Sequence, residues 1–377
     1  MRFSLLCVSW LVVSTVFSLS CSSSGGRTEP VQRLPEVPAA GGYAAGVSAP
    51  FVGRIEGGRI VAAGGCNFPG VPAAQGGSKR FYDDIFVFDP AVGAWQAAGR
   101  LPKPLAYGAS ATMPEGVICA GGTDSAGRAV RDAFLIAGDT VRTLAPLPEA
   151  MDNCAGAALD GRFYVAGDTL FCIYDPSADA WQRGAVWPGA ERRVQPVLVA
   201  QAGRVWLFGG YDPAGPEFVH RGGYGYDPST GAWEAVAGPE DADGEPLLAA
   251  GGAGVAWGED SILCVGGVNA AVFAAALQRG QAIAADPAHD SLRQAQREYM
   301  EREPVWYRFN DRVAVFHPAT GRWSLGADRL PQGARAGAGA VVLQRNDGAG
   351  SGVVLFNGEI KPGVRTPEVW LWQLSKN

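Results

Sequence analysis

The chain has 377 residues, of which 53 are glycine and 26 are proline, and this composition predicts many turns and little helix. Its formal net charge at pH 7 is −6, which argues against a nucleic-acid partner because phosphate binding needs a basic face. The charge does not exclude a small anionic ligand that is held by a few local arginines.

Residues 1–21 are predicted to be an export signal. Arg2 supplies the positive start, and the apolar run from Leu5 to Phe17 is too short to span a membrane comfortably. Small residues before Cys21 and a Ser/Gly stretch after it resemble a bacterial lipoprotein signal, in which the cysteine is lipidated; ordinary signal cleavage is the alternative. We therefore expect an exported protein, either in the periplasm or anchored in the outer membrane through Cys21, with residues 22–30 as a flexible tether.

A sequence motif then recurs along the chain at one fixed internal spacing. An aromatic residue, Asp (once His) and Pro are followed by a tryptophan that lies six residues after the Asp or His. The four copies are Phe88-Asp89-Pro90 with Trp95, Tyr174-Asp175-Pro176 with Trp181, Tyr226-Asp227-Pro228 with Trp233, and Phe316-His317-Pro318 with Trp323. Repetition at this scale indicates one supersecondary unit that is copied around an axis.

Each unit is predicted to contain four short strands. The second strand is an apolar run, and the six runs end at Gly65, Gly122, Asp168, Gly210, Gly267 and Gly358. Short strands with turn signals and one Gly/aromatic motif per unit are typical of a β-propeller, in which the tryptophan packs one blade on the next. The prediction is an all-β, six-bladed propeller that forms a single domain over residues 31–377.

Two blades depart from the repeat. The second lacks the Asp-Pro and the tryptophan between Phe134 and Leu147, and the sixth has no fourth strand after Trp372. Residues Val31–Pro35 resemble the Leu-Pro end of other fourth strands, so we expect them to complete the sixth blade and to remove an exposed sheet edge.

The five cysteines after the signal are not expected to form a disulfide framework, because their number is odd. Cys119 and Cys264 occupy the same position of the second strand in two different blades. This pattern predicts small buried hydrophobic residues rather than catalytic or metal-binding thiols.

Nearly all extra length lies in one loop, between the second and third strands of a blade. The insertions are Cys66–Arg80, Tyr211–Arg221 and Val268–Phe309, and equivalent loops of a propeller share one face, where function is expected. The longest insertion predicts helix over about 270–303, in two pieces, Ala270–Ala285 and Ala288–Arg302. It could serve as a stabilising cap on the rim or as a lid on the pocket.

A short loop at the end of the sixth blade's second strand carries three charges, Glu359, Lys361 and Arg365. A solvated loop with an internal ion pair is one interpretation of this pattern. The run Phe356–Thr366 closely resembles the Asn-Gly-Glu-x-Lys-Pro-Gly-x-Arg-Thr motif of the bacterial N-acetylneuraminate epimerases, also called sialate mutarotases. These are exported, kelch-type six-bladed propellers.

The resemblance covers most of the chain after the signal, in a cyclically permuted order. Residues 41–136 resemble the family's C-terminal part, and residues 155–374 resemble its N-terminal and central part. It implies an isomerase that interconverts the α and β anomers of free N-acetylneuraminate without a cofactor or metal. Glu359 then matches the proposed proton acceptor, and Arg365 matches the arginine that works with it.

Further residues are candidates for binding the sugar acid. Arg365 and Arg193 are suited to its carboxylate, Lys361 to the substrate or to neutralising Glu359, and Gln195 follows Arg193 in an Arg-x-Gln pattern that the family shares. The candidates for hydroxyl or amide contacts are Asn67, Lys79, Tyr107 and Asn269, each of which could instead be part of a turn or of the rim.

Two other functions are considered. A glycan-binding propeller lipoprotein without catalysis would lack a paired acid and base, which Glu359 and Arg365 provide. A copper oxidase of the galactose-oxidase type needs two histidine ligands with tyrosines. The chain has only His220, His289 and His317, and His317 replaces the Asp of the repeat, so this function is rejected.

Overall fold

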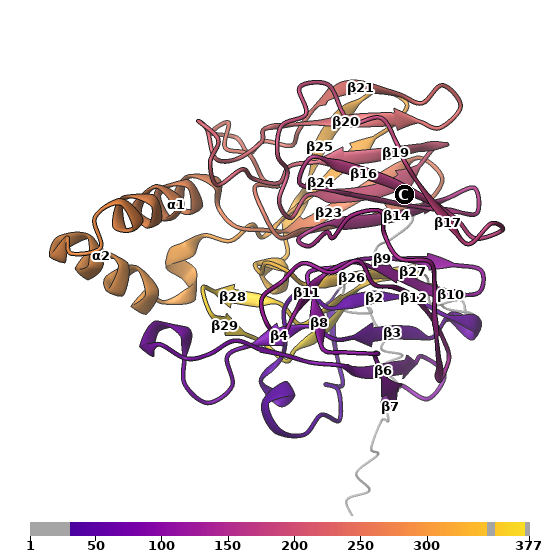
Figure 1. Ribbon diagram of the computed structural model, residues 1–377, viewed down its shortest axis with the longest axis horizontal. Coiled ribbons are helices and arrows are strands. Elements are labelled where there is room, and N and C mark those ends of the chain that lie inside the picture. Colours follow the sequence, from indigo (N-terminus) through magenta and orange to yellow (C-terminus); the bar gives the residue numbers. More distant parts are fainter. Residues whose placement is uncertain (1–30, 345–350, 374–377) are drawn as a thin grey trace, which may run out of the picture.

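The computed structural model describes residues 31–344 and 351–373. In these residues the chain forms six four-stranded antiparallel sheets that are arranged as blades around a central axis (Figure 1). The predicted all-β, six-bladed propeller is therefore confirmed. The predicted signal, Cys21 and the tether lie outside the described residues.

The strands follow each other from the inside of each blade to its outside. Blades 1 to 3 are β2 (Phe51–Arg54), β3 (Ile60–Ala63), β6 (Asp84–Asp89) and β7 (Ala94–Arg100); β9 (Ala109–Met113), β10 (Gly116–Ala120), β12 (Ala133–Ala137) and β13 (Thr140–Thr143); and β14 (Ala155–Leu159), β15 (Arg162–Gly167), β16 (Leu170–Asp175) and β17 (Ala180–Arg183). Blades 4 to 6 are β18 (Val197–Gln201), β19 (Arg204–Phe208), β20 (Gly222–Asp227) and β21 (Ala232–Ala237); β22 (Gly252–Trp257), β23 (Ser261–Gly266), β24 (Arg312–His317) and β25 (Arg322–Arg329); and β26 (Gly339–Gln344), β27 (Ser351–Phe356), β30 (Val369–Gln373) and β1 (Val31–Leu34). The second blade keeps all four strands although its outer part lacks the repeat motif.

The tryptophan of the repeat joins neighbouring blades, as the sequence predicts. In each case the indole Nε1 donates a hydrogen bond to a backbone carbonyl at or just after the end of the outer strand of the preceding blade. The bonds are Trp95 to Pro35 (2.9 Å), Trp181 to Ala145 (2.7 Å), Trp233 to Ala185 (2.6 Å) and Trp323 to Ala237 (2.8 Å). The indole thus buries its apolar ring between two blades while its only donor is satisfied.

The glycine pairs at the ends of the second strands are required by close packing of the backbone. Gly209 has a φ of 57°, and a Cβ atom added to it would lie 1.8 Å from the carbonyl oxygen of Leu248. Only glycine tolerates both this conformation and this approach. The five cysteines of the described part are free and buried, as predicted.

The first strand of the chain closes the ring. β1 pairs with β30 in an antiparallel register that sets Val31 opposite Trp372 and Leu34 opposite Val369, which confirms the predicted closure. Leu34 is 8% exposed and belongs to the core between blades 6 and 1. Without β1, β30 would be an edge strand with one side unpaired.

Removing residues 22–36 is therefore expected to destabilise the protein, whereas removing residues 22–30 is not. Burial of a leucine contributes about 1.5–3 kcal/mol, so the free energy of unfolding should fall by at least about 2 kcal/mol when Leu34 is lost. Urea unfolding followed by tryptophan fluorescence measures the difference between the two shortened proteins. Equal midpoints would show that β1 contributes nothing to the closure.

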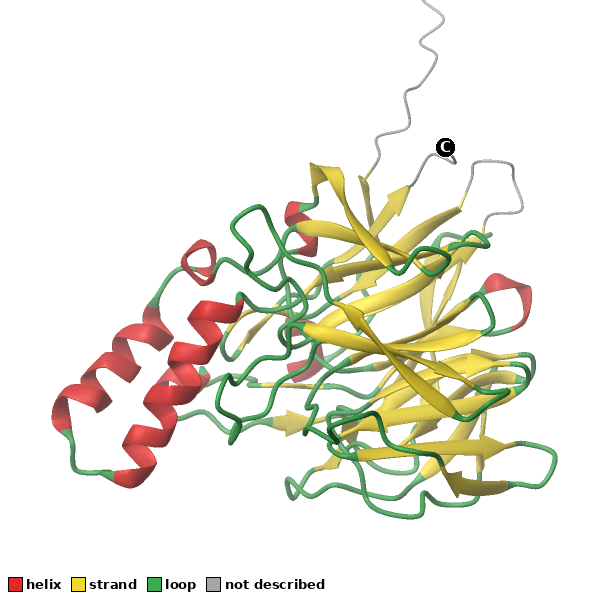
Figure 2. Ribbon diagram, turned by 90° about the horizontal axis from the view of Figure 1, so that it is seen from above, coloured by secondary structure: helices red, strands yellow, loops and turns green. Residues whose placement is uncertain are grey.

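The insertion of blade 5 forms a helical hairpin that projects from one face of the propeller (Figure 2). Its helices are α1 (Ala270–Ala285) and α2 (Asp290–Glu301), so the predicted helices are confirmed, with the second beginning two residues late. Asp286-Pro287 separates them, because the residue before a proline is disfavoured in helix. No helix in the described part of the chain is long and apolar enough to span a membrane.

The other insertions lie on the same face. The 3₁₀ helix η3 (Ala73–Gln75) of blade 1 contacts α2, and the 3₁₀ helix η4 (Pro304–Tyr307) contacts the hairpin of β28 (Glu359–Lys361) and β29 (Val364–Arg365) in blade 6. Two further short ribbons, β4 (Cys66–Asn67) with β5 (Arg80–Phe81) and β8 (Leu105–Ala106) with β11 (Thr123–Asp124), extend blades 1 and 2. This face carries the candidate site.

Candidate active site

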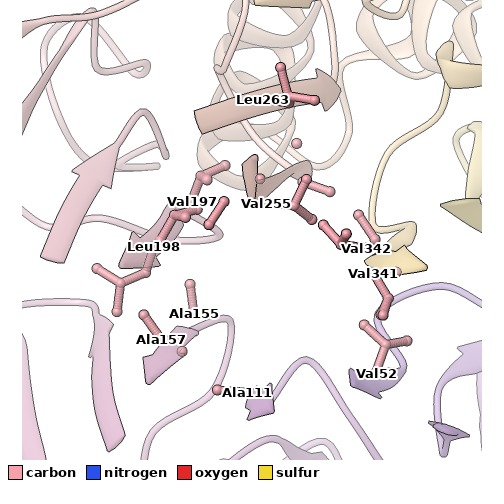
Figure 3. A pocket seen from close by; sticks show the side chains of 18 of the residues that line it. Val52, Ala111, Ala155, Ala157, Val197, Leu198, Val255, Leu263, Val341 and Val342 are labelled. Atoms are coloured by element: carbon pink, nitrogen blue, oxygen red, sulfur yellow. The ribbon is translucent and has the colours of Figure 1, made fainter. Parts of the chain in front are cut away.

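A central channel with a volume of about 1550 Å³ runs along the axis of the propeller. The innermost strands of all six blades line it with small and aliphatic side chains, among them Val52, Ala111, Ala157, Val197 and Val342 (Figure 3). The ionisable residues of this lining, Arg54, Asp260 and His317, stand at the strand ends opposite the insertions. The charged candidates from the sequence lie at the other end, at the mouth of the channel, where the insertions lie.

The β28–β29 hairpin carries the two most important side chains. Asn357 and Gly358 follow β27 with φ of 52° and 109°, and this left-handed turn redirects the chain toward the axis. Glu359 then forms a backbone bridge with Ala336, beside the channel residue Gly337. In the hairpin register Glu359 stands directly opposite Arg365.

Glu359 and Arg365 form an ion pair through Oε2 and Nη1. The Arg365 side chain is 3% exposed and the Glu359 side chain is 23% exposed, so the carboxylate faces the mouth and the guanidinium lies behind it. Arg365 Nε also donates to Ser48 Oγ at 2.9 Å, and its Cζ lies 5.5 Å from the centre of the Phe68 ring. These contacts fix the guanidinium, and through it the carboxylate. The interpretation as a solvated loop does not fit a pair whose guanidinium is buried.

The environment shifts the protonation of this pair. Burial raises the pKa of Glu359 above its ordinary value, and this effect outweighs the opposing charges of Arg365 and Lys79. Burial lowers the pKa of Arg365, but the negative charge of Glu359 overcomes it, so that the net pKa is raised. Arg365 is therefore a permanent cation, and Glu359 is a carboxylate whose proton affinity lies closer to neutrality.

Tyr107 and Lys79 complete this side of the mouth. Lys79 Nζ donates to Tyr107 Oη at 3.1 Å and lies 4.9 Å from the centre of the same ring. Burial raises the pKa of Tyr107 well above its ordinary value, so its hydroxyl stays protonated. Both side chains lie close to the ion pair, since Lys79 lowers the pKa of Glu359 and Tyr107 raises the pKa of Arg365. The fold thus brings together four of the site residues that the sequence predicts, namely Glu359, Arg365, Lys79 and Tyr107.

Lys361 and Asn269 connect the mouth to the helical hairpin. Lys361 Nζ donates at 2.9 Å to the carbonyl of Arg302, just after α2, and Asn269 Oδ1 caps α1 by accepting from the backbone N–H of Val272 at 3.0 Å. Both side chains hold the hairpin in place at the edge of the site. The structure thus gives each of them a positioning contact.

Asn67 and Arg193 are committed to the scaffold. Asn67 Nδ2 donates to the carbonyls of Gly42 and Gly46, both at 2.7 Å, and Tyr82 donates to its Oδ1 at 2.8 Å. Arg193 is 3% exposed. Its guanidinium hydrogen-bonds Glu191 through Nε (3.0 Å) and Nη2 (2.6 Å), and the carbonyls of Gly209 (2.6 Å) and Gly222 (3.1 Å) through Nη1. The structure does not bring these two side chains into the site.

Some residues of the mouth were missed in the sequence. Ser48, which positions Arg365, belongs to no motif and could not have been found. Asn153 donates no side-chain hydrogen bond within the described residues, but its Oδ1 accepts from Gln195 Nε2 at 3.0 Å, and both residues line the channel. Asn153 stands two residues before the first strand of blade 3, as Tyr107 and Gln195 do in blades 2 and 4, so an alignment of the repeats could have revealed it.

Comparisons with known proteins agree with the fold and the motif. The family model described as N-acetylneuraminate epimerase matches residues 16–142 and 144–377. The N-acetylneuraminate epimerase of Haemophilus influenzae (strain PittEE) is 32% identical over 236 residues, which are 60% of this chain and 58% of the relative. That of Yersinia enterocolitica is 30% identical over 234 residues, 59% of this chain and 56% of the relative. Each alignment thus spans less than two thirds of the relative's own length.

A solved structure, titled "Structure of YjhT", covers 91% of this chain and 98% of its own with a TM-score of 0.62 and 17% identity. At this identity the likeness supports the propeller fold alone. The family model, in contrast, covers nearly the whole sequence, including the Glu359–Arg365 hairpin. The chain therefore belongs to the N-acetylneuraminate epimerase family.

Proposed function

We propose that this protein is an isomerase that interconverts the α and β anomers of free N-acetylneuraminate, as the names of its relatives imply. The observation that carries the proposal is the Glu359–Arg365 pair, whose carboxylate is partly exposed at the mouth of the channel while its guanidinium is buried. A solvated surface loop has no need of a buried cation behind a carboxylate.

The reaction requires the sugar ring to open and close. Glu359 in its ionised form takes the proton of the anomeric hydroxyl and delivers it to the ring oxygen as the bond between that oxygen and C2 breaks, which leaves an open-chain ketone and an ionised Glu359. When the ring closes on the other face of the ketone, Glu359 takes the proton from the attacking hydroxyl and delivers it to the new anomeric oxygen. The raised pKa of Glu359 makes it a stronger base for both transfers than an ordinary glutamate.

The substrate carries its own carboxylate on the anomeric carbon. Arg365 is a fixed cation next to Glu359, and Lys79 is exposed at the same mouth. A cation beside the anomeric centre binds the substrate carboxylate and keeps it from repelling Glu359. Tyr107, whose hydroxyl stays protonated, is placed to donate a hydrogen bond to the sugar.

The rate should depend on pH through Glu359. Its folded-state pKa is raised, so kcat/KM should fall tenfold for each pH unit below a midpoint that lies above the ordinary glutamate value of about 4.3. Because its pKa is raised by folding, Glu359 binds its proton more tightly in the folded than in the unfolded protein. Protonation of Glu359 therefore stabilises the folded state, and this contribution is lost as the pH rises through the folded-state pKa. Protonation of Glu359 should therefore remove the activity without itself destabilising the fold.

The measurement is the excess rate of anomer equilibration between pH 4 and pH 8, after the spontaneous rate is subtracted, with circular dichroism at each pH. A midpoint below the ordinary glutamate value, or a loss of activity that coincides with unfolding, would exclude Glu359 as the titrating base.

We also propose that the protein acts after export, either as a periplasmic protein or as a lipoprotein. The support is the sequence of residues 1–21, with its positive start, apolar run and Cys21. Mass spectrometry of the mature protein tests this. A lipid-modified N-terminus at Cys21 is expected, and an unprocessed Met1 would contradict export.

The function itself is tested with the α anomer, released in situ by a sialidase and followed by proton NMR. The purified protein without residues 1–21 should hasten the appearance of the β anomer. Unchanged kinetics together with ligand binding would instead favour a non-catalytic glycan-binding propeller.

A further inference from the structure

Six residues form a ring at the mouth of the channel, one just before the first strand of each blade, at equivalent positions of the repeat. All six have a left-handed backbone, with φ between 49° and 65°. They are Ala49, Tyr107, Asn153, Gln195, Gly251 and Gly337. Backbone hydrogen bonds join neighbours in this ring, from Tyr107 to Ala49 (3.0 Å), from Ala49 to Gly337 (2.7 Å), from Gly337 to Gly251 (2.7 Å) and from Gln195 to Asn153 (2.7 Å).

The side chains of this ring are distributed unevenly. Blades 5, 6 and 1 carry Gly251, Gly337 and Ala49, whereas blades 2, 3 and 4 carry Tyr107, Asn153 and Gln195. A left-handed backbone is unfavourable for a residue with a side chain, most of all for Tyr and Gln, and glycine is the residue without this cost. Strained residues that line a pocket indicate a role for their side chains. The polar side chains at three of these positions therefore point to a function at the mouth.

Asn153 and Gln195 form a pair of amides. Gln195 Nε2 donates to Asn153 Oδ1 at 3.0 Å, which leaves Gln195 Oε1 as an acceptor and Asn153 Nδ2 as a donor. Neither atom has a hydrogen-bond partner within the described residues. The Gln195 side chain extends over Gly251, since a Cβ atom on Gly251 would lie 3.3 Å from Gln195 Oε1. The free acceptor and the free donor lie on either side of the hydrogen bond between the two amides, and they can complement a secondary amide, whose N–H and C=O point in opposite directions.

The amide pair lies on the far side of the mouth from the acidic group. Glu359 belongs to blade 6, and its partner Arg365 contacts Ser48 of blade 1. Asn153 and Gln195 belong to blades 3 and 4, which lie opposite in a ring of six. In N-acetylneuraminate the acetamido group sits on C5, across the six-membered ring from the anomeric C2. A sugar that binds with C2 at Glu359 and with C5 toward the axis of the propeller directs its acetamido group toward this pair.

We propose that Asn153 and Gln195 form the subsite that recognises the acetamido group, with its N–H donating to Gln195 Oε1 and its C=O accepting from Asn153 Nδ2. This inference rests on the proposed function and names the part of the substrate that sets specificity. A 5-hydroxyl analogue of the sugar cannot make both hydrogen bonds, so wild-type protein discriminates against it.

The test compares N-acetylneuraminate with its 5-hydroxyl analogue in the anomer equilibration assay. Gln195→Gly and Asn153→Gly remove the amides and also relieve the left-handed backbone, so both variants should fold. Each should lower kcat/KM for N-acetylneuraminate about tenfold, the value of one hydrogen bond in a binding site. Turnover of the 5-hydroxyl analogue should change less than threefold, since it makes no use of the pair. Ala49→Gly, the matched control in the same ring, should leave both rates unchanged.

The outcomes separate this inference from the proposed function. If the wild type accelerates equilibration but the Gly variants lose the same factor with both sugars, or with neither, the amide pair does not read the acetamido group and the proposed function stands. If the variants unfold at temperatures where the wild type and Ala49→Gly are folded, the pair is structural and the inference is wrong. If the wild type accelerates neither sugar, the proposed function fails and this inference fails with it.

Discussion

Replacement of Glu359 by glutamine is expected to reduce kcat/KM for anomer interconversion by about 100- to 10,000-fold, the usual contribution of a general base. Glutamine keeps the size and the hydrogen-bonding capacity of the side chain but cannot accept the anomeric proton. The affinity for the sugar should be nearly unchanged or slightly higher, because the positive charge of Arg365 is no longer neutralised by Glu359 and attracts the substrate carboxylate more strongly. Excess equilibration rates and saturation-transfer NMR measure the two effects separately.

Glu303→Gln is the matched control, because Glu303 is an exposed glutamate of the helical insertion that precedes η4. It should keep the wild-type rate. Should Glu359→Gln retain more than half of the wild-type kcat/KM, the base is another group and the assignment of Glu359 is wrong.

Replacement of Arg365 by methionine should have the second large effect, on stability and on pH dependence together. It leaves Glu359 without its cation, and breaking a buried ion pair from one side costs about 3 kcal/mol or more. Because the Glu359 side chain is 23% exposed, water compensates in part, and we expect a loss of about 2 kcal/mol in the free energy of unfolding at pH 7.

The same change should raise the pKa of Glu359 further, since Arg365 opposes the effect of burial. The acid limb of the pH profile then moves to higher pH, and kcat/KM at neutral pH falls both for this reason and through loss of the carboxylate contact. Denaturant unfolding and the pH profile measure both effects.

The double variant Glu359→Gln/Arg365→Met should recover most of the lost stability, because it buries no unpaired charge. An additive loss of stability in the double variant would show that the two side chains do not interact in solution.

The sequence predicts the fold well because the spacing of the repeat identifies each blade of the propeller. Trp95, Trp181, Trp233 and Trp323 recur at one spacing, and each one donates to the preceding blade in the structure. The closure through β1 was also predictable, since Leu34 matches the end of the other outer strands. Local signals sufficed here because each blade contacts mainly its two neighbours.

The candidate site is only partly predictable. Glu359 and Arg365 follow from one continuous motif, and their pairing follows from a hairpin of a few residues. The sequence predicts Arg193 as a substrate-binding residue, but in the structure its guanidinium is hydrogen-bonded to Glu191 and to the carbonyls of Gly209 and Gly222. These contacts depend on how blade 4 packs. Burial and partners of a polar side chain arise from tertiary structure, which spacing along the chain does not contain.

Asn153 illustrates the opposite case. Nothing in its neighbourhood marks it as functional, and its left-handed backbone and its bond with Gln195 become visible only in three dimensions. Its position in the repeat was nevertheless present in the sequence. In related propellers, the position just before the first strand of each blade should therefore be inspected for larger polar residues where other blades have Gly or Ala.

Exchange NMR on N-acetylneuraminate at anomeric equilibrium tests directly whether Glu359 catalyses the interconversion. Magnetisation transfer between the signals of the α and β anomers gives both rate constants in one sample. We expect the wild-type protein to raise both rate constants by the same factor and to leave the anomer ratio unchanged, and we expect Glu359→Gln to lose this effect. Wild-type rate constants equal to those of the free sugar, in a sample where saturation transfer shows the sugar bound, would contradict this expectation.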